Sequence, residues 1–217
     1  MRRLVLAALV LAVAVLAIGC GGDDGGEAAS PEPLDECVEV EAPEPRDPGA
    51  NEAPTEPLPS GTTYSLVFET SCGSFTVELD PELAPNTSAS LAALAGEAYF
   101  DDTIFHRVAS GFVIQGGDPT QTGSGGPGYS TVDAPPAGAA YPRGTFAMAK
   151  TSFEPAGTSG SQFFVVTTES WSLPADYAIV GSVTEGMETV DRIDALGTGD
   201  GPPSQPVVVE RVTVTES

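Results

Sequence analysis

Short stretches of alternating apolar and polar residues, separated by turn-forming residues, dominate the chain from residue 62 onwards. The clearest case is a pair of runs at 64–69 and 75–79, the second of which alternates from Phe75 to Leu79. A period of two is typical of strands with one buried face, and the intervening turn predicts a β-hairpin. Six further apolar or alternating runs predict strands at 103–108, 113–116, 146–148, 163–167, 179–183 and 207–214.

Two segments change to the spacing of an amphipathic helix. Residues 85–96 begin with Pro85, which suits the first turn of a helix. In residues 186–196, apolar positions recur at steps of three from Met187 to Ile193. Eight short strands, turn-rich connections and only two helices favour a mainly β fold: a closed eight-stranded antiparallel β-barrel capped by two short α-helices.

The first 19 residues have a different pattern. Arg2 and Arg3 precede an apolar run that is shorter than a membrane-spanning helix and ends at Gly19. This is the plan of a secretory signal peptide, and an uncleaved membrane anchor is the alternative. The segment LAIGC at 16–20 resembles the lipobox of bacterial lipoproteins, in which the cysteine becomes lipidated. We therefore expect a lipid on Cys20 and an extracytoplasmic location on the outer face of the bacterial cell membrane.

Residues 20–61 form a stretch that is rich in acidic residues, proline and glycine. Twelve Asp or Glu residues between positions 21 and 60 face a single basic residue, Arg46. Such a composition lacks the apolar content that offsets the entropy of ordering, so we expect a mostly disordered tether that docks only at 37–40. The chain then divides into a signal peptide at 1–19, a tether at 20–61 and one folded domain at 62–217.

Charge and cysteine content narrow the classes of function. The formal charge of −23 repels phosphate backbones, which disfavours nucleic-acid binding. Two cysteines follow Cys20, namely Cys37 and Cys72. In an oxidising compartment an even pair suggests a disulfide, which would fasten the end of the tether to the domain; two buried free thiols are the alternative.

The candidate functional residues concentrate at 99–118, where Arg107 stands between strand-like runs and Phe112 and Gln115 follow a Ser-Gly turn. No His, Cys and carboxylate cluster has metal-ligand spacing, so we expect no metal and no cofactor. His106 is the only histidine and no Gly-x-Ser-x-Gly elbow is present, which disfavours a triad hydrolase. Because strand neighbours face opposite sides, His106 is expected to be structural if Arg107 is functional.

Four sequence blocks resemble the cyclophilin family of peptidyl-prolyl isomerases over residues 62–216. They are FHRVASGFVIQGGD at 105–118, GTFAMA at 144–149, GTSGSQFF at 157–164 and VGSVTEGM at 180–187. The resemblance implies an eight-stranded barrel with two helices, and it makes Arg107 the catalytic arginine. The positions that it assigns to the proline groove or the substrate backbone are Phe112, Val113, Gln115, Ala149, Lys150, Gln162, Phe164, Leu173 and Tyr177. Without it, Arg107 would be an ordinary surface arginine, and Phe112 and Phe164 ordinary core residues.

The rim of the implied groove departs from the family. With the sequences aligned on Gly181, Ser172 stands where a tryptophan is common and Tyr177 where a histidine is common; a shift of one residue would instead place Trp171 at the tryptophan position. We therefore expect peptide binding with weak binding of cyclosporin-type inhibitors. The resemblance implies an isomerase of X–Pro bonds in proline-containing polypeptides. Together with the expected lipid anchor it predicts a protein that assists folding outside the cytoplasm, and we expect a monomer. A surface-anchored proline-peptide-binding module or holdase, and an inert cell-wall structural protein, are the alternatives.

Overall fold

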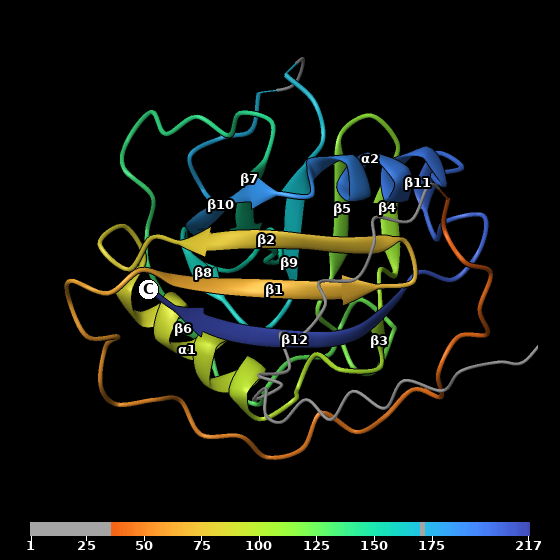
Figure 1. Ribbon diagram of the computed structural model, residues 1–217. Helices are drawn as coiled ribbons and strands as arrows, with labels where there is room; N and C mark the ends of the chain where they lie inside the picture. The colour runs from red at the N-terminus through yellow and green to blue at the C-terminus, as the bar shows by residue number, and fades with distance from the viewer. Residues whose placement is uncertain (1–35, 170–171) are drawn as a thin grey trace, which may run out of the picture. The chain divides into compact units, whose positions relative to one another are not determined.

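The computed structural model describes residues 36–169 and 172–217 (Figure 1). The predictions for the signal peptide, for Cys20 and for Trp171 lie outside the described residues. Within these residues no helix combines the length and the apolar character that crossing a membrane would require.

A single antiparallel sheet of ten strands makes up most of the structure and curls into a half-barrel (Figure 1). Its pairing order is β11-β4-β5-β9-β7-β10-β2-β1-β12-β3, and a separate small sheet pairs β6 with β8. The strands are β1 (Tyr64–Thr70), β2 (Gly73–Leu79), β3 (Thr103–Ile104), β4 (Arg107–Ala109), β5 (Val113–Gly116), β6 (Thr131–Val132), β7 (Thr145–Met148), β8 (Thr158–Ser159), β9 (Phe163–Val166), β10 (Ile179–Glu185), β11 (Asp200–Gly201) and β12 (Val208–Glu216).

The mainly β class and the two helices are confirmed, whereas the closed eight-stranded barrel is not. The paired strands run from β11 at one end to β3 at the other, and no pairing joins these two within the described residues. The strand predicted at 103–108 is divided at Phe105 and His106, because β3 pairs with β12 while β4 pairs with β5 and β11. The two-residue strands β6, β8 and β11 were not predicted.

Both helices form where the sequence predicts them. The first, α1 (Pro85–Gly96), starts on its proline and contacts β12, and the second, α2 (Met187–Ala195), contacts β2, β4 and β5. Gly186 precedes α2 with a φ of 75°, and a Cβ there would lie 2.2 Å from the Ser74 carbonyl oxygen. Only glycine fits this left-handed, tightly packed position.

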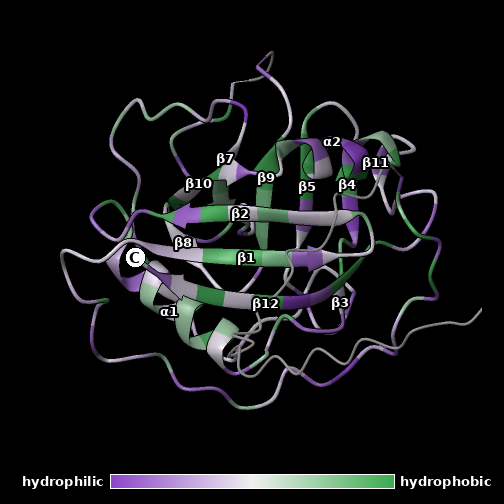
Figure 2. Ribbon diagram, viewed as in Figure 1, coloured by the Kyte–Doolittle hydropathy of each residue, from purple (hydrophilic) through white to green (hydrophobic). Residues whose placement is uncertain are grey.

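The central strands separate two apolar clusters, since successive side chains of a strand point to opposite faces. In β9, Phe163 belongs to the main core, where it packs against Phe68 and Phe146, whereas Phe164 belongs to a smaller outer cluster. Figure 2 shows the apolar stretches of these central strands. The outer cluster comprises Ala109, Val113, Tyr141, Ala147, Phe164 and Val166, with Phe112, Ala149, Leu173, Tyr177 and Ile179 packed against it.

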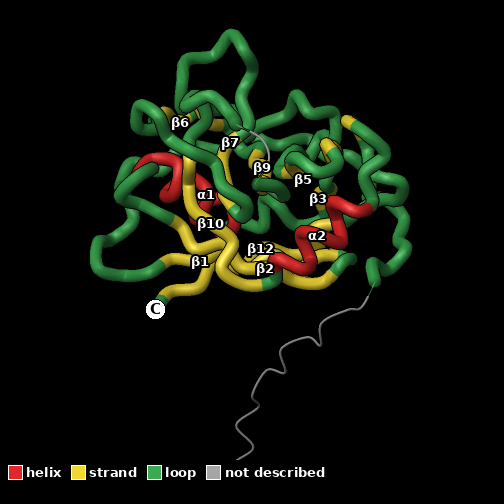
Figure 3. The backbone as a smooth tube through the Cα atoms, turned by 90° about the horizontal axis from the view of Figure 1, so that it is seen from above, coloured by secondary structure: helices red, strands yellow, loops and turns green. Residues whose placement is uncertain are grey.

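Seen from above, the loops lie mainly on the side of β5, β7 and β9 that faces away from β1, β2 and β12 (Figure 3). Residues 36–61 contain no helix or strand, yet they contact the domain at more points than the single docking site expected at 37–40. The disulfide between Cys37 and Cys72 is present. Further along, Arg46 and Asn51 hydrogen-bond to the domain, so this part of the expected tether is not independent of it. The boundary at residue 62 stays a prediction.

Candidate active site

The predicted site residues line one region of the molecule. Nine of the ten surround a depression of about 170 Å³, namely Arg107, Phe112, Val113, Gln115, Ala149, Lys150, Phe164, Leu173 and Tyr177. The tenth, Gln162, lines an adjacent depression of about 440 Å³ that shares Gln115, Ala149 and Lys150 with the first. We call the two depressions together the groove.

Strand register places these residues side by side. Arg107 on β4 lies opposite Gln115 on β5, and Gln115 lies opposite Phe164 on β9. Phe164 in turn lies opposite Ala147 on β7. Residues that face each other across a ladder share one face of the sheet, so the sheet presents a charged, a polar and an aromatic side chain in a row.

A chain of hydrogen bonds runs through the polar part of the groove. The Arg107 Nη1 atom donates to Gln115 Oε1 at 3.0 Å, and Gln115 Nε2 donates to Gln162 Oε1 at 3.1 Å. Gln162 Nε2 then donates to the carbonyl oxygen of Gly125 at 2.9 Å. Each amide orientation is therefore dictated by its neighbour, and the arginine is linked to a loop that lies 18 residues away in sequence.

The guanidinium of Arg107 is also held by a carboxylate. Its Nε and Nη2 atoms donate to the two oxygens of Asp200 on β11, at 2.6 and 3.1 Å. The Arg107 hydrogen bond, opposed by a slight desolvation, lowers the pKa of Asp200, so Asp200 is ionised at neutral pH. The Arg107 side chain is 33% exposed and that of Asp200 is 67% exposed, so the pair sits at the solvent edge of the groove.

The apolar part of the groove is built on aromatic contacts. Val113 and Phe164 are buried, and the Tyr177 ring meets Phe164 edge-to-face at 5.5 Å between centroids. The Tyr141 hydroxyl donates to the Tyr177 carbonyl oxygen at 2.8 Å and accepts from the Tyr177 amide at 3.1 Å. Tyr141 thus fixes the backbone that presents Tyr177, while Ser172 is exposed.

Lys150 is placed differently from what its charge suggests. Its side chain is only 3% exposed, and Nζ lies 2.6 Å from Asp176 Oδ2. The same ammonium donates to the carbonyl oxygens of Thr151 and Glu154 and lies 5.6 Å from the centre of the Tyr177 ring. The ammonium group of Lys150 is therefore used in contacts with Asp176 and with the loop after β7. Only the main chain and the aliphatic part of the side chain are left to contact a ligand.

Asp118 fixes the loop that carries Gly125. The fully buried carboxylate accepts hydrogen bonds from the amides of Thr120, Ser124 and Gly125 and from the Thr120 hydroxyl. Burial alone would raise the pKa of Asp118, but the hydrogen bonds from Thr120 and Gly125 outweigh it and lower the pKa. A Cβ on Gly125 would lie 2.0 Å from Asp118 Oδ1, so only glycine lets this approach occur.

His106 lines neither depression of the groove. Burial lowers the pKa of its imidazole; the Asp118 carboxylate opposes this effect and the positive charge of Arg107 adds to it. The ring is therefore neutral at pH 7. Across residues 36–169 and 172–217, no group of three or more His, Cys, Asp or Glu side chains is arranged to hold a metal ion.

Sequence reasoning missed four residues that position the site: Asp118, Tyr141, Asp176 and Asp200. Asp118 closes the FHRVASGFVIQGGD block, and its place before a glycine-rich loop was a usable signal. Asp200 lies 93 residues from its partner Arg107, and no local pattern marks it. The loop at 123–128, which holds four glycines in six residues, lines the larger depression.

Comparisons with known proteins agree with this geometry. The family model of the cyclophilin-type peptidyl-prolyl cis-trans isomerases matches residues 65–214. A probable peptidyl-prolyl cis-trans isomerase B of Mycobacterium leprae is 35% identical over 183 residues, with 75% of this chain covering 59% of that protein's length. A peptidyl-prolyl cis-trans isomerase-like 1 of Aspergillus fumigatus is 37% identical over 156 residues, which cover 70% of this chain and 95% of the relative.

Solved structures show the same relationship. A crystal structure of a cyclophilin-type isomerase from Cryptosporidium parvum has a TM-score of 0.65 at 28% identity, and covers 71% of this chain and 99% of that one. The same protein in the presence of the dipeptide Ala-Pro has a TM-score of 0.64 at 30% identity, over 70% of this chain and 99% of that one. The chain belongs to the cyclophilin-type peptidyl-prolyl cis-trans isomerase family.

Proposed function

We propose that this chain catalyses the cis/trans isomerisation of X–Pro bonds in polypeptides outside the cytoplasm, anchored to the membrane by a lipid on Cys20. The observation that carries the isomerase activity is the gathering of Arg107, Gln115 and the apolar residues around Phe164 in one depression. The Ala-Pro dipeptide used with the related structure supports proline-containing peptides as the ligand. The protein acts as a monomer in this proposal.

The reaction needs an electrostatic element and a grip on the proline. Amide resonance gives X–Pro rotation a barrier of roughly 18–20 kcal/mol. In the twisted transition state the prolyl nitrogen regains a lone pair, and a guanidinium that points at it stabilises the twisted form more than the planar one. Within the described residues, Asp200 and Gln115 bind three of the five guanidinium N–H donors of Arg107, and in this proposal the other two face the substrate.

One charge-assisted hydrogen bond contributes about 1.5–3 kcal/mol, or roughly ten- to a hundredfold in rate. The rest must come from the apolar residues. Val113 and Phe164 form a buried floor for the pyrrolidine ring, with Phe112 and Leu173 beside them. Gln115 and main-chain groups near Ala149 hold the residue before the proline, so rotation is confined to one side of the bond.

The decisive experiment measures isomerisation of a proline peptide by the purified chain and by Arg107→Ala. We expect the variant to lose about ten- to a hundredfold in kcat/KM, the loss that corresponds to one charge-assisted hydrogen bond. Arg211→Ala is the matched control, because Arg211 is an exposed arginine on β12. An inactive wild type, or equal losses in both variants, would refute the isomerase proposal.

A proline-peptide-binding module or holdase is the second candidate. Phe153 favours it: this side chain is 96% exposed, and its neighbours Thr151 and Glu154 line the larger depression. Such an aromatic offers apolar contact to a chain bound in the groove. This candidate predicts that Arg107→Ala, though catalytically impaired, still rescues a deletion strain, whereas the isomerase proposal predicts that it does not.

The lipid anchor and the location have separate support. The lipobox-like segment at 16–20 supports lipidation of Cys20. The disulfide between Cys37 and Cys72 fits an oxidising, extracytoplasmic compartment. Palmitate labelling of cells should mark the protein and vanish in Cys20→Ala. Labelling that persists in this variant would rule out the anchor.

A further inference from the structure

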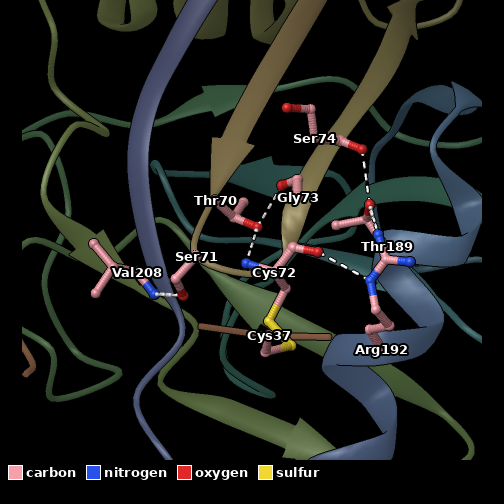
Figure 4. The surroundings of a disulfide bond; sticks show 9 residues. All are labelled: Cys37, Thr70, Ser71, Cys72, Gly73, Ser74, Thr189, Arg192 and Val208. Atoms are coloured by element: carbon pink, nitrogen blue, oxygen red, sulfur yellow. Dashed lines mark hydrogen bonds between the residues drawn. A yellow bond between two sulfur atoms is a disulfide. The ribbon is translucent and has the colours of Figure 1, made fainter. Parts of the chain in front are cut away.

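Residues 37–51, which we call the strap, precede the region 65–214 that the family model matches. Their backbone nevertheless hydrogen-bonds to the domain at several points. The strap is fastened at its start by the Cys37–Cys72 disulfide and by the Val38 amide, which donates to the Ser71 carbonyl oxygen at 2.7 Å. Cys72 lies in the turn between β1 and β2, and its carbonyl oxygen accepts from Arg192 Nε at 3.0 Å (Figure 4). The start of the strap is therefore fastened to the β1–β2 turn by one covalent bond and one hydrogen bond.

The middle of the strap is bound next to Asp118. The Arg46 amide donates to the Pro119 carbonyl oxygen at 3.0 Å, and the Gln121 side chain donates to the Pro43 carbonyl oxygen at 2.8 Å. The Arg46 guanidinium donates to the carbonyl oxygens of Tyr99 and Asp101. Arg46, the only basic residue of this acidic segment, thus binds two carbonyl oxygens of the turn before β3.

The end of the strap contacts the glycine-rich loop (residues 123–128), which lines the larger depression of the groove. Asn51 donates twice to the Pro127 carbonyl oxygen, from its amide at 3.3 Å and from Nδ2 at 3.2 Å, and Nδ2 also donates to Pro48 at 2.8 Å. The Gly49 carbonyl oxygen lies 3.9 Å from where a Cβ of Gly128 would be.

The glycine-rich loop is thus held from two directions. The Asp118 carboxylate accepts hydrogen bonds from the amides of Ser124 and Gly125, while the Asn51 side chain donates one to the carbonyl oxygen of Pro127. The Gly125 carbonyl oxygen also accepts the hydrogen bond that fixes Gln162. Gln162 in turn accepts from Gln115, which binds Arg107, so the loop is connected to the arginine. A loop with four glycines in six residues loses much conformational entropy on ordering, so it needs such external contacts.

We propose that the strap is a positioning element of the isomerase site, in which Asn51 holds the glycine-rich loop in place and the Cys37–Cys72 disulfide keeps the strap on the domain. The inference deepens the proposed function and rests on it for its catalytic consequence. Weakening the strap frees the loop, which lowers the fraction of molecules whose groove is ready to bind. This effect raises KM and leaves kcat, which depends on Arg107, nearly unchanged.

The test uses the full-length chain with Asn51→Ala and Asn51→Asp. Both variants keep the backbone amide bond to Pro127 and lose the side-chain donation; Asp keeps the shape of Asn but places an acceptor beside two carbonyl oxygens, so it should be impaired at least as much as Ala if side-chain donation is what matters. We expect KM to rise about two- to tenfold, the range of one neutral hydrogen bond, with kcat within twofold. Amide hydrogen exchange should accelerate by a similar factor in the glycine-rich loop and not in β1 or β2. Glu52→Ala, an exposed neighbour, is the matched control and should change neither.

The double variant Cys37→Ser/Cys72→Ser should reproduce the faster exchange of the loop. Unchanged exchange in both Asn51 variants would overturn the proposal, as would acceleration spread evenly over all strands, which marks general destabilisation. A wild type without isomerase activity would refute the proposed function. In that case the exchange measurements still decide whether the strap holds the loop.

Discussion

Asp200→Ala tests how far the charged end of the groove depends on a residue outside the four sequence blocks that resemble cyclophilins. The substitution removes the acceptor of two Arg107 hydrogen bonds, at 2.6 and 3.1 Å, and leaves only the bond to Gln115 at 3.0 Å. The guanidinium then has a single attachment near its tip. It keeps its charge but not its orientation.

Two effects of this substitution oppose each other. Removing a negative charge strengthens the net field of Arg107 in the groove, which favours the twisted transition state. Losing the carboxylate also releases a side chain that carries about 2 kcal/mol of rotamer entropy. The prolyl nitrogen presents a lone pair and no full charge, so the gain in field is the smaller effect. Because the Asp200 side chain is 67% exposed, the lost attachment is worth about 0.2–1 kcal/mol, and not the larger value of a buried pair.

We therefore expect Asp200→Ala to lower kcat/KM by up to about fivefold, the rate factor for 1 kcal/mol. This loss is smaller than that of Arg107→Ala. The measurement is cis/trans exchange of a proline peptide at low salt, and again at high salt, where the difference from wild type should shrink. Asp191→Ala is the control, because Asp191 on α2 pairs with Arg143 at 2.7 Å outside the groove and should leave kcat/KM unchanged.

The same pair predicts a pH dependence. The Arg107 hydrogen bond lowers the pKa of Asp200 below its ordinary value of 3.8. A carboxyl whose pKa is depressed by folding contributes stability above its unfolded pKa, and that contribution is lost as the pH falls through the folded value. As the pH falls from neutral to the ordinary pKa, Asp200 stays ionised, so its titration should not change the activity. The activity should fall only below that pH, and Asp200→Asn should lack this decrease.

For the orienting role itself, the refuting result is an Asp200→Ala variant that is folded and as active as wild type.

Further predictions concern the glycine-rich loop, the disulfide and the floor of the groove. Gly125→Ala should raise KM at least tenfold, because the added Cβ would lie 2.0 Å from Asp118 Oδ1. Gly126→Ala is the control and should bind peptide normally, because a Cβ there has no atom within 4 Å. Equal KM values for the two variants would contradict this prediction. Reducing the disulfide, whose cysteines are 35 residues apart, should lower the free energy of unfolding by about 2–4 kcal/mol in urea titrations, and the reductant should not affect Cys37→Ser/Cys72→Ser. Phe164→Ala should cost about 3–5 kcal/mol of stability and weaken peptide binding measured by calorimetry; unchanged affinity would remove Phe164 from the floor.

Local patterns were sufficient for the elements whose cause is local. The hairpin of β1 and β2 and both helices follow from alternation, from Pro85 and from Gly186, and they were predicted within one or two residues. The strands β6, β8 and β11 are two residues long, which is too short for any periodicity to show. Their existence depends on pairing with distant partners. The number of strands was therefore mispredicted and the closed barrel is not confirmed, although the class was correct.

The same distinction between local patterns and long-range contacts applies to the site. The groove residues were identified because the four sequence blocks resemble a known family, and strand register then places Arg107, Gln115 and Phe164 in a row. Some residues that hold these side chains in position lie inside the motifs, such as Asp118 and Gln162, but Asp200 and Asn51 lie outside them. Asp200 accepts hydrogen bonds from Arg107, 93 residues away, and Asn51 donates to Pro127, 76 residues away. Because Asp and Asn are common in loops for other reasons, the sequence does not mark these two as positioning residues. Composition gives no sign of this role for Asn51, because a proline-rich acidic segment predicts a tether, and the contacts of Arg46, Asn51 and the disulfide depend on distant residues of the domain. The chemistry of this site can thus be read from local sequence, whereas its rigidity is a property of long-range pairs that only the folded chain brings together.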